Sequence, residues 1–166
     1  CFPDDVEKTY DRSFEKFAEG RLAEDMPHIT SRICGVCPTA HHMAGTKALD
    51  DLYKVTPTDA GRKIREMLYN IFMVEDHALH FYFLGGPDFV VGPDAPPAER
   101  NILGVINKVG MDIAGKVLKM RRDGHHLIKM MGGRAVHPNW GLPGGVSCGI
   151  SEEKRAEIEQ LGRDAI

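Results

Sequence analysis

The 166-residue chain has few cysteines, no long apolar run and no large net charge, and each of these absences excludes a class of protein. Its four cysteines, Cys1, Cys34, Cys37 and Cys148, are too sparse for a disulfide framework and fit a reducing compartment such as the cytoplasm. No apolar stretch approaches the roughly 20 residues of a transmembrane helix. A formal net charge of −3 gives no reason to expect nucleic acid or an anionic membrane as a partner.

The chain also lacks an initiator methionine and a signal-peptide pattern, since it begins Cys1-Phe2. We therefore expect a fragment or a processed product. Its length is sufficient for one domain with a sizeable core, and 42% hydrophobic and 27% charged residues are ordinary for a globular protein. We expect residues 1–166 to belong to a single domain.

Helical periodicity dominates, and neither a convincing β-hairpin nor a βαβ unit is present. Thr56 is a good helix N-cap, and Ser151 can cap the last helix. Gly104, Gly110 and Gly115 weaken the longest helix, which we expect either to break or to pack very closely against a neighbour. The expected fold is mainly α, a helical bundle with peripheral loops and little β structure. The expected helices are 11–20, 38–54, 57–84, 98–131 and a last one from 152, with loops at 21–32, 85–97 and 134–149.

Two thiols one turn apart form the most informative cluster. Thiolates are soft ligands that favour nickel, copper(I), zinc and iron over magnesium or calcium. Gly35 between them lets the backbone turn so that Cys34 and Cys37 point the same way. Pro38 can begin a helix whose N-terminus favours thiolate, and His41 can donate a hydrogen bond back to a sulfur. The segment predicts a soft-metal or redox site on a tight turn.

The bare spacing of Cys34 and Cys37 leaves three other interpretations open. A thioredoxin-like site requires a Val/Ile-rich strand before the motif, and the preceding residues make a poor strand. A zinc site that adds His41 and His42 lacks the long spacer between the usual ligand pairs. The third interpretation is a buried, inert pair of thiols.

Two further polar clusters lie later in the chain. Asp76 falls on or near an apolar stripe, where a carboxylate needs an arginine or a metal as partner. The simpler interpretation is a surface acid beside His77 and His80. Arg134 and His137 lie in a compact glycine-rich loop and could bind a carboxylate, a cluster sulfur or a partner chain.

Taken together, these segments resemble the large, catalytic subunit of nickel–iron hydrogenases. The motif Arg-x-Cys-Gly-x-Cys-x-x-x-His over residues 32–41 is highly specific with these flanks. The resemblance extends over nearly the whole chain and also includes residues 14–21, 76–82 and 132–138. The likeness is strongest to cytoplasmic, cofactor-coupled types, including the heterodisulfide-reductase-associated (F420-non-reducing) and NAD-reducing groups.

The resemblance implies oxidation of H2 or reduction of protons by heterolytic chemistry at a nickel–iron centre. In the family, the iron carries carbon monoxide and cyanide, and electrons pass to an iron–sulfur small subunit and on to further electron-transfer subunits. Arg134 and His137 match a loop that faces this small subunit near its proximal cluster. The expected compartment is the cytoplasm.

The resemblance also assigns roles to individual residues. Cys34 matches the cysteine that binds nickel terminally, and Cys37 matches the one that bridges nickel and iron. His41 matches a histidine that hydrogen-bonds the bridging thiolate, and Asp76 matches an aspartate above the open metal position. Glu15 matches a ligand of a structural magnesium or another divalent ion, although a surface-helix glutamate is the simpler interpretation.

The sequence departs from the family at two sites. The second cysteine pair of the form Asp-Pro-Cys-x-x-Cys is absent, because Cys148 stands alone, and the Glu-Gly-His segment is missing. The chain therefore supplies half of the thiolate ligands, and we expect it not to assemble the centre alone. A hydrogenase-derived scaffold remains an alternative, as does a relative of the quinone-reducing subunit of complex I, which typically lacks the cysteine pair. A thiol-redox role is a further alternative.

Overall fold

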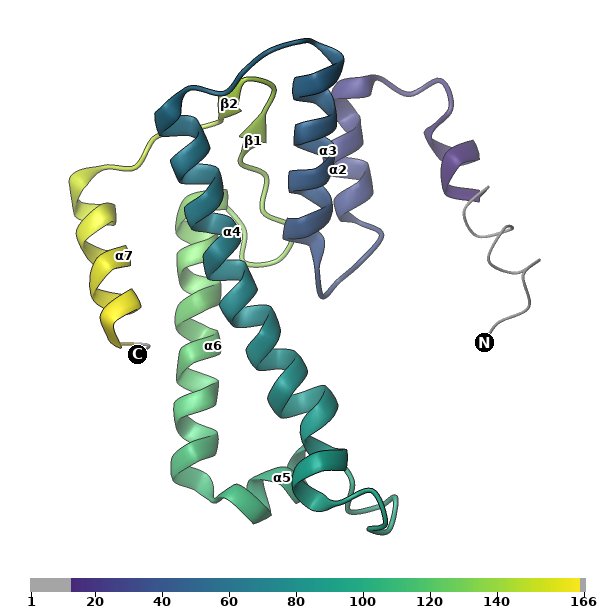
Figure 1. Cartoon of the computed structure of the whole chain (residues 1–166), viewed down its shortest axis with the longest axis vertical. Helices are drawn as coiled ribbons and strands as arrows, with labels where there is room; N and C mark the ends of the chain where they lie inside the picture. The colour runs from purple at the N-terminus through teal and green to yellow at the C-terminus, as the bar shows by residue number, and fades with distance from the viewer. Residues whose placement is uncertain (1–12, 165–166) are drawn as a thin grey trace.

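The computed structural model describes residues 13–164, and this part of the chain is mainly helical, as the sequence predicts. Helices α4 and α6 run side by side along the molecule, α2 and α3 pair at one end, and α5 lies at the other (Figure 1). The long helices are α3 (Pro38–Leu52), α4 (Asp59–Leu79), α6 (Met111–Gly132) and α7 (Glu152–Asp164). The short elements are η1 (Ala23–Asp25), α2 (Met26–Ser31), π-helical η2 (His80–Gly85) and η3 (Pro87–Val91), α5 (Ile102–Val109), β1 (Gly141–Leu142) and β2 (Gly145–Val146).

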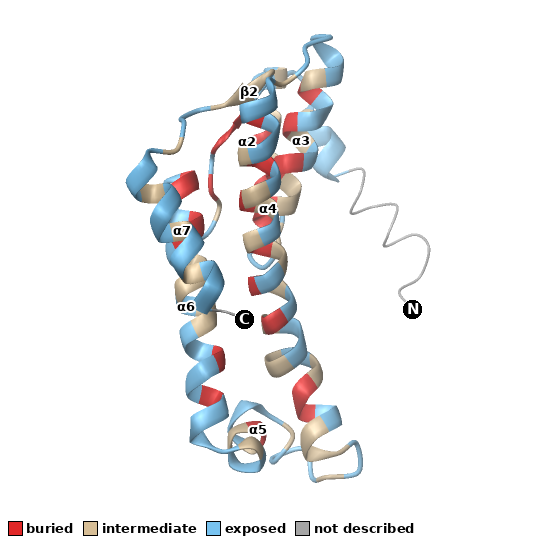
Figure 2. Ribbon diagram, turned by 60° about the vertical axis from the view of Figure 1, so that its left-hand side comes forward, coloured by how far each residue is buried: buried red, intermediate tan, exposed pale blue. Residues whose placement is uncertain are grey.

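The core lies where α3, α4 and α6 meet the segment that follows α6. Its buried members are Met43, Leu68, Met131 and Trp140, and Leu68 is completely shielded from solvent. Buried residues follow the inward sides of the long helices in Figure 2. The α2–α3 pair is therefore anchored to the best-packed part of the molecule. Among residues 13–164, no helix combines the length and apolar character needed to cross a bilayer.

Two helix starts differ from the sequence prediction. Helix α4 begins after Thr58, whose Oγ1 accepts a hydrogen bond from Gly61 N at 3.1 Å, so the predicted Thr56 cap was wrong. The residue before a proline is pushed toward extended backbone, which removes Thr56 from the helix start. Residues 26–31, expected as loop, form α2, in which Pro27 occupies the first turn, where its missing N–H has no intrahelical partner to lose.

Glycines near the middle of the chain also act differently from expectation. The backbone does not become a loop at Gly85 but continues as the π-helical segments η2 and η3 until Gly92, where φ is +114°. The expected break in the long helix is confirmed at Gly110, whose φ of +85° is costly for other residues. The expected cap Ser151 is also confirmed, because its Oγ accepts from Lys154 N at 3.3 Å.

A buried arginine joins α3, α4 and the β1–β2 hairpin. Arg65 Nε donates to Gly145 O at 2.9 Å, Arg65 Nη2 donates to Leu142 O at 2.6 Å, and the guanidinium also pairs with Asp50. The Gly144 N–H donates to Asp50 Oδ1 at 2.7 Å. Burial raises the pKa of Asp50, but these donors lower it further, and the net pKa lies below its ordinary value.

Replacing Arg65 with methionine is expected to lower the free energy of unfolding by about 3–5 kcal/mol, because the Asp50 carboxylate is left buried without its guanidinium. Arg62→Met is the matched control on the same helix, since Arg62 is exposed and pairs only with Asp59 and Glu66. We expect its loss to stay below about 1 kcal/mol. Denaturant titrations followed by circular dichroism measure both. Equal losses would show that the Arg65 network does not hold the hairpin.

Candidate metal centre

The α2–α3 pair presents the thiol loop. Helix α2 ends at Ser31, α3 begins at Pro38, and the cysteines lie in the short connection between them. The two helices approach closely at Gly45, where an added Cβ would lie 2.8 Å from the Cα of Pro27. Such an approach requires glycine, so the loop is held by two tightly packed helices.

Cys34, Cys37 and His41 come together in this loop. Their ligand atoms all lie within 4.8 Å of one another, and within residues 13–164 this is the one group of three or more such side chains suited to a metal. Cys37 Sγ lies 2.8 Å from Cys34 Sγ, which is longer than a disulfide bond of about 2.05 Å, and both thiols are free. All three residues are half-buried, so they are open on one side.

The two thiols differ in acidity. The hydrogen bond from Cys37 lowers the pKa of Cys34, whose sulfur also accepts from Cys37 N at 3.2 Å. Burial raises the pKa of Cys37 to about 11, and both its bond to Cys34 and the charge of Asp76 act in the same direction. The pair therefore holds one proton more firmly than the other. A metal that binds both sulfurs must displace the Cys37 proton.

Asp76 on α4 faces the same region. Its negative charge raises the pKa of both Cys34 and Cys37, so the carboxylate is close enough for its field to reach the thiols. Its Oδ1 is buried and has no hydrogen-bond partner in the described part of the chain. A buried polar atom of this kind calls for a partner. Two soft thiolates, an imidazole and this oxygen fit a nickel–iron group better than a hard cation.

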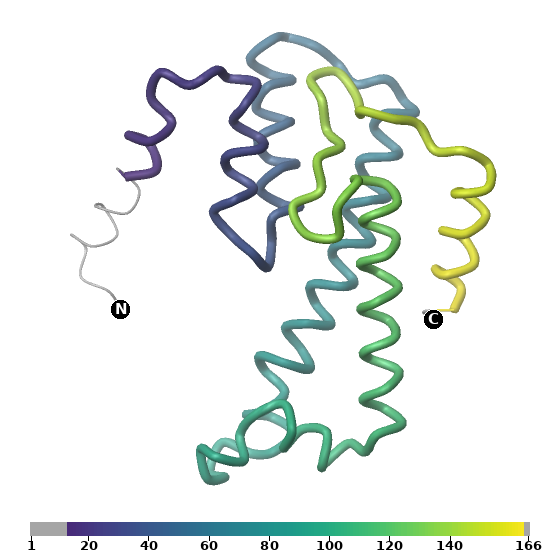
Figure 3. The backbone as a smooth tube through the Cα atoms, turned by 180° about the vertical axis from the view of Figure 1, so that it is seen from behind, coloured from purple at the N-terminus to yellow at the C-terminus, as the bar shows by residue number. Residues whose placement is uncertain are grey.

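His137 ties the segment after α6 to the base of the thiol loop. Its Nδ1 donates to Ser31 O at 2.9 Å, and its φ of +55° is unusual for a residue other than glycine. Figure 3 shows this segment passing between α6 and the α2–α3 pair. Arg134, in the same loop, is exposed. Glu15 is exposed on the helical turn 13–18 and lies outside the thiol group, so its role as a metal ligand stays a prediction.

His42 does not serve as a ligand, which contradicts the zinc interpretation. It is 1% exposed, its Nδ1 lies 3.3 Å from Pro27 O, and its Nε2 accepts from Gly141 N at 3.0 Å. The ring also packs on Trp140, with 4.7 Å between the ring centroids. Both nitrogens are therefore used to join α2, α3 and the segment after α6. Sequence analysis missed this role, for which the only signal was a histidine adjacent to His41.

Sequence analysis also missed Glu75. It is 4% exposed and pairs with Arg121 and His125 on α6, whereas the neighbouring Asp76 is half-buried. Its position three residues after Phe72 on the apolar stripe was the available signal, because i and i+3 share a helix face.

His42→Phe is expected to lower the free energy of unfolding by about 1–3 kcal/mol, since Pro27 O and Gly141 N lose their buried partner. Burial lowers the pKa of His42, so the unfolded chain binds more protons as pH falls through about 6.5. Wild-type stability should fall across that interval, and the variant should lose this part of the slope. Denaturant titrations from pH 5 to 8 measure it.

The control for this pair of measurements is His126→Phe, because His126 is exposed and pairs only with Glu157. We expect this control to keep the wild-type pH dependence and to lose no more than about 1 kcal/mol. An unchanged slope in His42→Phe would contradict a neutral, buried His42.

Comparison with known proteins places this geometry in context. Residues 12–102 match the nickel-dependent hydrogenase family. A subunit of the F420-non-reducing vhu hydrogenase of Methanocaldococcus jannaschii is 48% identical over 147 residues, which cover 89% of this chain and 35% of the relative. The beta subunit of the NAD-reducing hydrogenase HoxS of Cupriavidus necator is 36% identical over 152 residues, covering 87% of this chain and 30% of the relative.

A solved structure shows the same arrangement. The crystal structure of an NAD+-reducing [NiFe]-hydrogenase in its H2-reduced state superposes with a TM-score of 0.85 at 31% identity, covering 92% of this chain and 34% of the other. A Ni-Fe-Se hydrogenase from D. vulgaris Hildenborough in its reduced state superposes with a TM-score of 0.77 at 32% identity, covering 90% of this chain and 33% of the other. The chain spans about a third of the length of the curated relatives it matches.

Proposed function

The chain belongs to the nickel-dependent hydrogenase family, and we propose that it forms part of the catalytic large subunit of a nickel–iron hydrogenase that oxidises H2 or reduces protons. The observation that carries this proposal is the convergence of Cys34, Cys37 and His41 within 4.8 Å on one tight loop. Because the chain spans about a third of its relatives, the activity belongs to the complete subunit, of which residues 1–166 are one portion of a single domain.

Each residue of the site has a proposed role. Cys34 binds nickel terminally, Cys37 bridges nickel and iron, and further ligands come from outside this chain. A nickel–iron centre with carbon monoxide and cyanide on the iron supplies the heterolytic cleavage of H2. Cys34 Sγ, as the terminal thiolate, takes up the released proton, and His41 orients the bridging sulfur and tunes its basicity. Asp76 Oδ1 faces the same space and offers a second acceptor.

The proposed partners follow from the relatives and from the loop after α6. An iron–sulfur small subunit accepts the electrons, with Arg134 and His137 facing it, and further electron-transfer subunits carry them on. A structural magnesium at Glu15 and a cytoplasmic location are part of the same proposal. The names of the relatives, F420-non-reducing and NAD-reducing hydrogenases, support a cofactor-coupled type.

Two alternatives make different predictions about the thiols. A scaffold, or a relative of complex I, needs no thiol pair, so the free Cys34–Cys37 pair beside His41 favours the hydrogenase. A thiol-redox protein would cycle the same pair through a disulfide, and a sulfur–sulfur distance of 2.8 Å leaves that possibility to experiment. Metal content separates all of these cases.

The test is elemental analysis and infrared spectroscopy of the complete enzyme from its native source. We expect nickel stoichiometric with the subunit, iron in excess of the partner's clusters, and carbon monoxide and cyanide stretching bands. Cys34→Ser and Cys37→Ser should each lose nickel and these bands, because serine is a poor ligand for soft metals.

Cys148→Ser is the matched control, since Cys148 is exposed and lies outside the thiol group. This variant should keep the wild-type nickel content. Zinc alone in the wild-type enzyme, or full nickel in Cys34→Ser, would overturn the proposed function. A reversible Cys34–Cys37 disulfide without nickel would establish the thiol-redox alternative instead.

A further inference from the structure

We infer that Glu75, held by Arg121 and His125, is a positioning residue that fixes the rotation of α4 and thereby aims Asp76 at the thiol pair. This inference rests on the proposed function and extends it to three residues that lie outside the metal site. It requires that the cluster hold α4 firmly, that Asp76 have no anchor of its own, and that the two acids be linked by one rigid helix.

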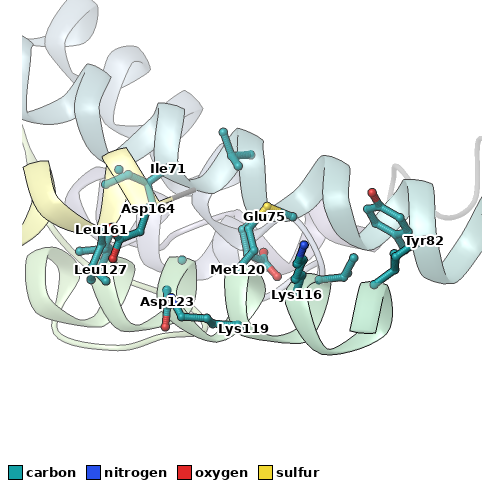
Figure 4. Close-up of a pocket in the computed structure, with 15 residues that line it drawn as sticks. Ile71, Glu75, Tyr82, Lys116, Lys119, Met120, Asp123, Leu127, Leu161 and Asp164 are labelled. Carbon is teal, nitrogen blue, oxygen red and sulfur yellow. The ribbon is translucent and has the colours of Figure 1, made fainter. Parts of the chain in front are cut away.

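The first observation is the geometry of the Glu75 cluster. Arg121 Nε and Nη2 donate to Glu75 Oε1 at 2.9 and 2.6 Å, and His125 Nε2 lies 3.2 Å from the same oxygen. The Glu75 side chain is 5% exposed, and that of Arg121 is 19% exposed. Figure 4 shows Glu75 in the cleft between α4 and α6. Charge-assisted bonds from a planar guanidinium are directional, so they fix the carboxylate in angle as well as in distance.

Helix α6 is shaped to receive this side chain. A Cβ added at Gly124 would lie 3.2 Å from both Cβ and Cγ of Glu75, so the stem of Glu75 rests against a helix surface without a side chain. Arg121 and His125 stand on either side of Gly124 along the chain and reach the carboxylate from there. Glu75 therefore sits in a slot whose floor and donors come from one turn of α6.

The second observation is that Asp76 lacks comparable support. In the part of the chain that the structure describes, its Oδ1 is buried without a hydrogen-bond partner. Successive residues of an α-helix point about 100° apart around the axis. With Glu75 fixed toward α6, Asp76 is directed away from that slot to the side from which its charge reaches Cys34 and Cys37. The direction of Asp76 is thus set by its neighbour.

The third observation is where the cluster lies along the helix. Regular α geometry ends at Leu79, and η2 then follows in the wider π form, where the regular i→i−4 bonds no longer set the rotation. The guanidinium of Arg121 also lies 5.1 Å from the ring centroid of Phe83 in η2. Arg121 therefore contacts residues before and after the change of helix form, and it holds the segment that carries Asp76 from both sides.

A role in stability alone does not account for this cluster. Replacing a buried ion pair by apolar residues of similar volume is often neutral or stabilising, so a charged trio is a poor means of adding stability. Apolar contacts between α4 and α6 would also tolerate some rotation, which bidentate bonds to one oxygen do not. The arrangement suits a requirement for one defined rotation of α4.

The test is a double-mutant cycle in the complete enzyme, using H2 turnover and infrared bands as readouts. Arg121→Met should lower turnover by on the order of tenfold to a hundredfold at unchanged nickel content, because a displaced group near the reacting atoms is this costly. In an Asp76→Asn background, the same change should cost no more than about twofold, within the usual error of additivity. The carbon monoxide and cyanide bands of Arg121→Met should shift toward those of Asp76→Asn.

Arg122→Met is the matched control, because Arg122 is 72% exposed on the same helix and pairs only with Asp123. It should leave turnover and bands unchanged. Glu75→Gln keeps the shape of the side chain but loses its charge. It should show a smaller loss with the same dependence on Asp76, and it decides the question if Arg121→Met fails to load nickel.

Three results would overturn the inference. These are full turnover in Glu75→Gln together with Arg121→Met, equal losses with and without Asp76, and an Asp76→Asn enzyme that behaves as wild type. In each case the wild-type enzyme still shows nickel and the infrared bands, so the inference fails while the proposed function stands. A wild-type enzyme without nickel and bands would overturn both.

Discussion

The buried Arg65 guanidinium is the contact on which the arrangement around the thiols depends. It binds Asp50 of α3 and two carbonyls of the β1–β2 hairpin, which is too short to be stable alone. Next to that hairpin, Trp140 and Gly141 hold His42, and His42 in turn contacts Pro27 of α2. The position of α2 thus depends, through a short series of contacts, on one arginine of α4.

This series of contacts carries the thiol loop without occupying the thiols. The histidine contacts to α2 end on backbone carbonyls, so the cysteine sulfurs and His41 remain open on one side. The negative charge of Asp76 disfavours a second thiolate, and the pKa of Cys37 is about 11. A bound cation reverses this balance, because it neutralises the thiolates and the carboxylate together. The loop is therefore built for a metal, and metal binding is coupled to loss of the Cys37 proton.

Sequence patterns predicted the local features well. The mainly α fold, the helix that begins at Pro38, the Ser151 cap and the break among the glycines follow from propensity and capping alone, and the thiol spacing identified the metal-ligand cluster. Helix α2 and the π-helical segments were missed, because packing against α3 and α5 decides them. The roles of Glu15 and Asp76 stay predictions, since their proposed partners are not part of the described chain.

Glu75 and Asp76 show why the remainder was beyond sequence reasoning. Both are acids on the same turn of α4, and the buried positions Leu68, Phe72 and Ala78 place Glu75 on the apolar stripe. A stripe position says that a side chain is buried, but it does not say what compensates its charge. Arg121 lies 46 residues away, and its contact depends on α6 folding back along α4. One acid received its partner from this chain, and the other was left for a partner from elsewhere. That division marks the boundary between what holds the fold and what serves the site.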